Sequence, residues 1–391
     1  MFKSNSPRSL VTAVLPNSIA RQVIEQLVNK EERAVFTWKA RGTLLSDSVW
    51  KSFFPSISPV KTMIQMVTPP GETDQLISKI IQAAKLNLQA IGAVYCVPCD
   101  HSFIGEKFRD WPASATDSIH STDKIQGDMS LIRCIVTAKT SDRISKAAIN
   151  AGAHGPIVFY SEGRGLRDRL GWLRITKEAQ KEVLTVIADN SDVEEIFDAM
   201  AKAGELHMPG RGFMYRQNVS KGLFNLPSRI SHHHYAANTQ QIINAIDHLA
   251  GHTHWRDQAA FDVGRGRGAG LSIMNHLAPP LEGQVGITIM ARREAINPIM
   301  DLMLDCGVPG LNIHDVRRVT HQSLQEKGTQ LLQEYSFIKA ITNTKTASKL
   351  AERVEALNSE ELFQDICVTV NEVPRIATYV HRPQNFKKSS A

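Results

Sequence analysis

Clusters of glycine and arginine are the residues of this sequence best suited to bind a ligand. The clearest are Gly163-Arg164-Gly165 and Gly210-Arg211-Gly212, and related clusters occur at Arg41-Gly42 and Gly264-Arg265-Gly266-Arg267-Gly268. Glycine lets the backbone turn with positive φ and present N–H groups to an anion, while a guanidinium offers paired donors to phosphate oxygens. This pattern indicates a site for a phosphate-bearing or similar anionic ligand.

The alternative for each cluster is a tight turn with a solvated arginine. Recurrence of the pattern in separate segments favours the binding interpretation, because a plain turn has no need of an arginine.

Cysteine and histidine groups offer a second kind of chemistry. Cys96 and Cys99, followed by His101, have the spacing of a metal or redox pair. No second such pair lies nearby, so the preferred interpretation is two small apolar thiols at a strand end. Another candidate metal group consists of His232, His233, His234, His252 and His254, for which we prefer solvated histidines. We therefore predict no metal site. Because the sequence has no nucleophile-base arrangement, paired carboxylate motif or dinucleotide fingerprint, we predict no enzymatic activity.

Residues 130–219 contain the elements that position the two best clusters. Apolar runs at residues 131–138, 157–160, 183–188 and 213–215 predict strands. Ser141-Asp142 and Ser191-Asp192 are expected to cap two amphipathic helices between them. The order strand, helix, strand, long loop, strand, helix, strand is that of a ferredoxin-like unit, an antiparallel sheet with both helices on one face. The other sheet face then needs a partner.

This stretch resembles the PII signal-transduction family of nitrogen regulation. The resemblance rests on His154-Gly155-Pro156 entering the second strand, on Gly163-Arg164-Gly165 leaving it and on Pro209-Gly210-Arg211-Gly212-Phe213 before the fourth strand. It implies that three such units pack their sheets into a trimer and bind an adenine nucleotide (ATP, ADP or AMP) in the clefts between units. Phe213 replaces the lysine that nitrogen-regulatory members have after these glycines.

The same order of elements recurs along the chain. We predict a first PII-like unit in residues 1–99, a linker in 100–129, a second unit in 130–222, a third in 229–319 and part of a fourth in 335–382. The predicted class is α+β, with repeated ferredoxin-like βαββαβ units packed as an intrachain pseudo-trimer. Each unit would thereby bury its uncovered sheet face within one chain.

Composition limits the possible environments of the chain. It has 391 residues, of which 42% are hydrophobic, and no apolar run approaches the length of a membrane span. The N-terminus lacks the apolar region of a secretory signal, and the five cysteines are an odd number, so we expect a reducing, cytoplasmic location without membrane insertion. The formal charge of +6 comes from basic residues spread over the whole chain.

These observations predict a non-enzymatic PII-like regulator. A small-molecule effector, an adenine nucleotide or similar anion, would bind between units, and exposed loops would contact a target protein. The alternatives are a nucleic-acid-binding module that uses the basic loops, which the dispersed charge does not favour, and a metal-handling or regulatory trimer-like protein.

Overall fold

The computed structural model describes residues 7–28, 34–42, 60–86, 92–108, 125, 127–165, 180–225, 283–325, 333–357 and 359–379. Within these residues, fifteen strands join into one continuous sheet, and all of the strand pairs are antiparallel. Helices pack against this sheet, so the predicted α+β class is confirmed.

Module 1 is the first of three sets of elements with the same order. It consists of β1 (Arg8–Pro16), α1 (Asn17–Leu27), β2 (Val35–Gly42), β3 (Val60–Thr68), the 3-10 helix η2 (Pro70–Glu72), α2 (Thr73–Ala84) and β4 (Gly92–Cys99). Its strands pair in the order β4-β1-β3-β2, which places the first and third strands in the middle. This is the strand arrangement of a split βαβ pair.

Module 2 has the same pairing order, β9-β6-β8-β7. It consists of β6 (Met129–Thr137), α3 (Ser141–Asn150), β7 (His154–Gly165), β8 (Gln180–Asp189), α4 (Val193–Gly204) and β9 (Gly212–Val219). The helix α3 ends before Gly152, whose φ is +102°, as its glycine predicts. The strands and helices predicted in residues 130–219 are confirmed.

Module 3 pairs as β14-β11-β13-β12. It consists of β11 (Gln284–Arg292), the 3-10 helix η5 (Arg293–Ala295), α8 (Ile296–Asp305), β12 (Gly310–Val319), α9 (His321–Gln325), β13 (Gln333–Asn343), α10 (Thr344–Ala356), the 3-10 helix η7 (Glu361–Phe363) and β14 (Cys367–Glu372).

The predicted third unit, 229–319, and the predicted partial fourth unit, 335–382, are therefore wrong. The strand β11 was expected to be the third strand of its unit, yet it pairs with β13 and β14, both of which follow it in the sequence. It is the first strand of a module that continues through the supposed fourth unit. The other elements predicted in residues 229–263 lie outside the described residues.

After each module the chain forms one short strand that pairs with a strand of another module. The strand β5 (His101–Ile104), after module 1, pairs with β14 of module 3. In the same way β10 (Lys221–Asn225), after module 2, pairs with β4, and β15 (Arg375–Thr378), after module 3, pairs with β9. The predicted linker in residues 100–129 thus begins with a paired strand, which its polar composition concealed.

The second strands of the modules also pair with one another. The end of β2 pairs with the start of β7, the end of β7 with the start of β12, and the end of β12 with the start of β2. Together with the exchanged strands, these pairings close the three modules into a ring.

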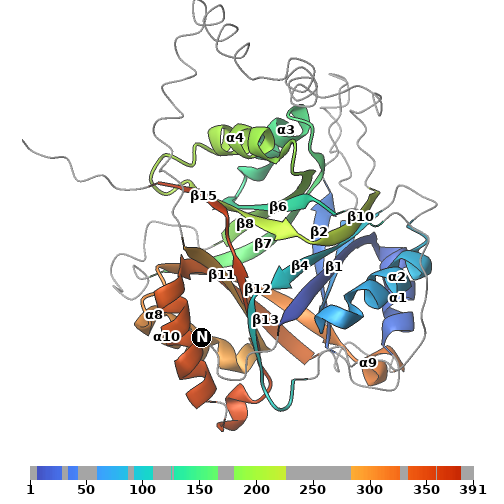
Figure 1. Cartoon of the computed structure of the whole chain (residues 1–391), viewed down its shortest axis with the longest axis vertical. Helices are drawn as coiled ribbons and strands as arrows, with labels where there is room; N and C mark the ends of the chain where they lie inside the picture. The colour runs from blue at the N-terminus through green and yellow to red at the C-terminus, as the bar shows by residue number, and fades with distance from the viewer. Residues whose placement is uncertain are drawn as a thin grey trace, which may run out of the picture.

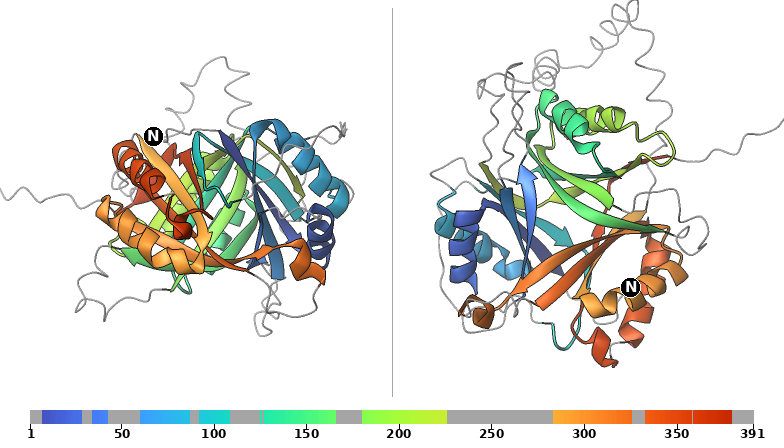
Figure 2. Two further views of the ribbon diagram at one scale, coloured as in Figure 1. Left: turned by 90° about the horizontal axis from the view of Figure 1, so that it is seen from below. Right: turned by 180° about the vertical axis from the view of Figure 1, so that it is seen from behind.

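Helices lie on the outside of this ring and strands on the inside (Figures 1 and 2). In each module an apolar cluster lies between the four strands of the module and its helices, as the alternation of side chains along the strands requires. A fourth cluster, with Phe36, Phe159 and Phe337, joins the inner faces of all three sheets. The helix-free face of each sheet is therefore buried against the other modules.

Candidate functional site at the module junctions

Arg41 connects the end of β2 in module 1 with module 2. Its Nη2 donates to Ser141 Oγ at 2.8 Å and to Asp142 Oδ1 at 2.9 Å, and it lies 3.6 Å from Glu182 Oε1. The side chain of Arg41 is 33% exposed and that of Asp142 is 77% exposed, whereas Glu182 is buried. Part of this ion-pair group is thus open to a competing anion from solvent.

Glu182 also holds the start of α3. Its Oε2 accepts the backbone N–H groups of Thr140 at 3.1 Å and Ser141 at 3.0 Å. The predicted capping of this helix by Ser141-Asp142 is therefore wrong, because neither side chain caps the helix and a carboxylate from β8 accepts from its first N–H groups instead.

Arg164 lies within β7 rather than in a turn. Gly163, Arg164 and Gly165 pair with the start of β12 in module 3, and Gly163 and Gly165 are not among the residues with positive φ. The guanidinium forms an ion pair with Glu162. The expectation that these glycines turn the backbone with positive φ is wrong, since extended backbone is needed for the pairing with module 3.

The second cluster does form a turn, before β9. Gly210 and Gly212 have φ values of +82° and +137°, and a Cβ on Gly212 would lie 2.1 Å from the carbonyl oxygen of Ile135. Arg211 is half exposed and forms an ion pair with Glu205 at 2.9 Å. Backbone geometry alone accounts for the glycines, as the turn interpretation expects.

The structure separates the two clusters of module 2. Arg164 is in β7 and Arg211 precedes β9, and these strands form opposite edges of the four-stranded sheet of the module. Arg41 and Gly42 pair with residues 157 and 158 near the start of β7, so they do not join Arg164. The cluster at residues 264–268 lies outside the described residues, and the strand end of module 3 that occupies the position of Arg41-Gly42 contains Arg317 and Arg318.

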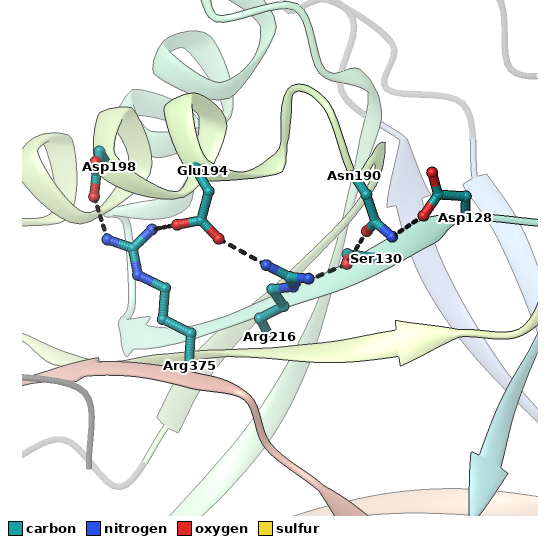
Figure 3. Close-up of polar contacts among 7 residues, drawn as sticks. All are labelled: Asp128, Ser130, Asn190, Glu194, Asp198, Arg216 and Arg375. Carbon is teal, nitrogen blue, oxygen red and sulfur yellow. Dashed lines mark hydrogen bonds and ion pairs between the residues drawn. The ribbon is translucent and has the colours of Figure 1, made fainter. Parts of the chain in front are cut away.

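Sequence reasoning missed the polar network that fastens β15 to module 2 (Figure 3). Arg375 forms ion pairs with Glu194 and, at 2.6 Å, with Asp198 on α4, and its guanidinium lies 4.3 Å from the ring centroid of Phe197. Arg216, on the adjacent strand β9, forms an ion pair with Glu194 at 2.6 Å. The network continues through Ser130, Asn190 and Asp128. The register of β15 against β9 brings Arg375 to the other residues of this network, which lie in module 2 or directly before it.

A buried ion pair in module 3 was also missed. Arg318 Nη1 donates to the hydroxyl of Tyr335 at 2.9 Å and lies 3.6 Å from Asp365 Oδ1. The other oxygen of Asp365 accepts from Tyr335 at 2.5 Å and from Arg292 at 2.8 Å. Burial is the main cause that raises the pKa of Tyr335 to about 12. This group fixes the positions of β12 and β13 relative to the segment before β14.

The two cysteines with metal-like spacing do not form a site. Cys96 belongs to the cluster under the helices of module 1 and Cys99 to the central cluster, because residues three apart in a strand point to opposite faces. Burial raises the pKa of the Cys99 thiol to about 12, which disfavours the thiolate that binds metals. No metal-ligating cluster occurs among the described residues. Histidines 232–234, 252 and 254 lie outside them.

None of the helices in the described part of the chain is both long and apolar enough to cross a bilayer.

Comparisons with known proteins give distant similarities. The chain matches no protein-family model and no curated protein. A structure of Arabidopsis thaliana PII bound to citrate is 17% identical and covers 24% of this chain and 80% of its own, with a TM-score of 0.20. Aspartate kinase from Synechocystis is 9% identical and covers 94% of this chain and 44% of its own, with a TM-score of 0.20. A protein from Galdieria sulphuraria is 11% identical, covering 55% of this chain and 99% of its own, with a TM-score of 0.16. At these TM-scores the description of the fold rests on the strand pairings.

Proposed function

We propose that the chain is a non-enzymatic, PII-like regulatory protein that replaces a trimer by three modules of one polypeptide. An anionic small molecule, with an adenine nucleotide as the candidate effector, binds at a junction between modules. The loops after the second strands then contact a target protein. This proposal goes beyond the observed fold, and it makes the junction between modules 1 and 2 the sensing element.

The observation that supports the proposal is the ion-pair group of Arg41. Its guanidinium crosses from one module to the next and binds an exposed carboxylate, that of Asp142, beside the hydroxyl of Ser141. A phosphate oxygen that replaced Asp142 could accept from the same guanidinium of Arg41. Because the group joins two modules, such a replacement would change how they are held together.

The energies involved make this exchange feasible. The exposed ion pair of Arg41 with Asp142 is worth about 0–1 kcal/mol, so little stability is lost when it opens. A phosphate with several charged oxygens therefore competes well with Asp142. A change in how modules 1 and 2 are held together would follow as a population shift.

Isothermal titration calorimetry with ATP, ADP, AMP and a short oligonucleotide tests the proposal. Substitution Arg41→Ala should weaken nucleotide binding by about ten- to a hundredfold, because one charge-assisted contact is lost. Arg164→Ala and Arg211→Ala test the two other clusters in the same way. Arg21→Ala is the matched control, since Arg21 is exposed on α1 and pairs with Glu25 one helical turn away.

Absence of nucleotide binding by the wild-type protein would refute the proposal, as would equal affinities of all four variants. Binding of the oligonucleotide with a steep salt dependence and no preference among nucleotides would instead support the nucleic-acid alternative.

A further inference from the structure

The inner faces of the three sheets share a polar layer inside the ring. In each module the central inward-facing residue of the first strand pairs with polar residues on the third and fourth strands. This interior polar layer consists of Thr12, Gln65 and Tyr95 in module 1, Arg133, Thr185 and Tyr215 in module 2, and Thr288, Lys339 and Thr369 in module 3. Modules 2 and 3 thus each place a cationic side chain in the interior.

Arg133 and Lys339 line one small cavity between these two modules. The cavity has a volume of about 20 Å³, and Tyr215, Asn312 and His314 also line it. A cavity that holds a single water has a volume of roughly 10–15 Å³, so this space suits one water or one monatomic anion. Apolar side chains complete the wall: Ile135, Phe159, Val183, Phe213, Ala340 and Ile341.

No carboxylate lies among the described residues that line this cavity. Arg133 is only 8% exposed; burial lowers the pKa of its guanidinium, and the neighbouring hydroxyls of Tyr215 and Tyr95 more than offset this effect. Lys339 retains some accessible surface, and its neighbouring charge is Arg133. A buried charge without a counter-charge raises the free energy of the folded state, and arginine keeps its proton even when it is buried.

Two polar atoms of residues that line the cavity also remain without a hydrogen-bond partner in the described part of the chain. They are Nε of Arg133 and Nε2 of His314. Buried groups of this kind are normally satisfied by the protein, by ordered water or by a bound ion. Burial and the charges of Lys339 and Arg133 lower the pKa of His314, so it adds hydrogen-bonding capacity rather than charge.

We infer that this cavity binds a small inorganic anion of the size of chloride, as the counter-ion of Arg133 and Lys339. The anion accepts hydrogen bonds from the two cations and thereby links the inner faces of modules 2 and 3. This site is separate from the junction of Arg41, and it does not depend on the binding of any nucleotide.

Unfolding measured as a function of bromide concentration tests this inference. Sodium bromide replaces sodium gluconate at constant ionic strength, because gluconate is too large for the cavity. Above its dissociation constant, bromide should lower the unfolding equilibrium constant of the wild type by about tenfold for each tenfold rise in concentration. Lys339→Met should lose this dependence. Lys349→Met, on the exposed surface of α10, is the matched control and should retain it.

Equal bromide dependence in the wild type and Lys339→Met would overturn the inference, because it would show a general salt effect. If Lys339→Met does not fold, line broadening of the chloride NMR signal by the wild-type protein replaces the comparison. Broadening that bromide reverses by competition supports the site, and a signal as narrow as in buffer alone refutes it.

Discussion

Two buried arginines, Arg318 and Arg133, differ in what balances their charge. They are 5% and 8% exposed. Arg318 faces the carboxylate of Asp365 and the hydroxyl of Tyr335. Arg133 faces a cavity without a carboxylate among the described residues. Burial is nearly equal, so the two arginines differ mainly in their surroundings: the chain supplies a carboxylate to Arg318 and supplies none among the described residues that line the cavity of Arg133.

The largest expected effect comes from removing the counter-charge that the chain supplies. Asp365→Asn leaves Arg318 and Arg292 facing a neutral amide, and breaking a buried ion pair in this way should cost about 3–5 kcal/mol of unfolding free energy. Urea unfolding measures this loss. Glu352→Gln, at an exposed position of α10, is the control and should change the unfolding free energy by less than about 0.5 kcal/mol. Similar values for the two variants would contradict the structural importance of the buried pair.

A smaller effect is expected where a partly exposed arginine has carboxylates from the chain. Arg375→Ala removes the ion pairs with Glu194 and Asp198 together with the contact on the Phe197 ring. We expect a loss of about 1.5–3 kcal/mol, because charge-assisted contacts and a cation-π contact disappear at once. Arg375→Lys should recover only part of it, since lysine lacks the planar fork that binds two carboxylates. If Arg375→Ala lowers the unfolding free energy no more than the Glu352→Gln control does, then the pairing of β15 with β9 is enough to hold the two modules together.

A pH dependence is expected at the uncompensated site. Burial, together with the charge of Arg133, lowers the pKa of Lys339 well below its ordinary value of 10.5. Between the lowered pKa and 10.5 the unfolded chain binds more protons than the folded one, so the unfolding free energy rises with pH across this window.

The measurement compares the wild type with Lys339→Met in halide-free buffer. The unfolding free energy of the wild type minus that of the variant should increase as the pH is raised toward 10.5. Toward pH 10.5, His314 is neutral and Arg133 is charged in both proteins, so neither group contributes to this difference. A difference that stays constant with pH would mean that Lys339 titrates as it does in water.

The sequence predicts the local elements well where apolar runs and turn residues agree. The first and second modules have the strands and helices that their patterns indicate, because alternation of apolar residues reports directly on burial. The boundaries predicted for the third module were wrong. Its strand β11 reads like any other apolar strand, and only its pairing with β13 and β14 shows that it is the first of the module.

The candidate sites were harder to predict, because they depend on contacts between modules. Glycine next to arginine at residues 163–165 resembles a turn, yet pairing with β12 makes it a strand. Arg133 and Lys339 each stand in the middle of an apolar run, which was a visible signal of a buried cation. The sequence does not show that the two runs face each other, since that follows from the closure of the ring.

Anomalous diffraction from a crystal soaked in bromide tests most directly whether an external anion balances the interior cations. We predict an anomalous peak in the cavity between Arg133 and Lys339, and no peak beside Arg318, where Asp365 already provides the negative charge. A cavity that holds only water density, with bromide found solely on the outer surface, would show that no external anion balances these two cations.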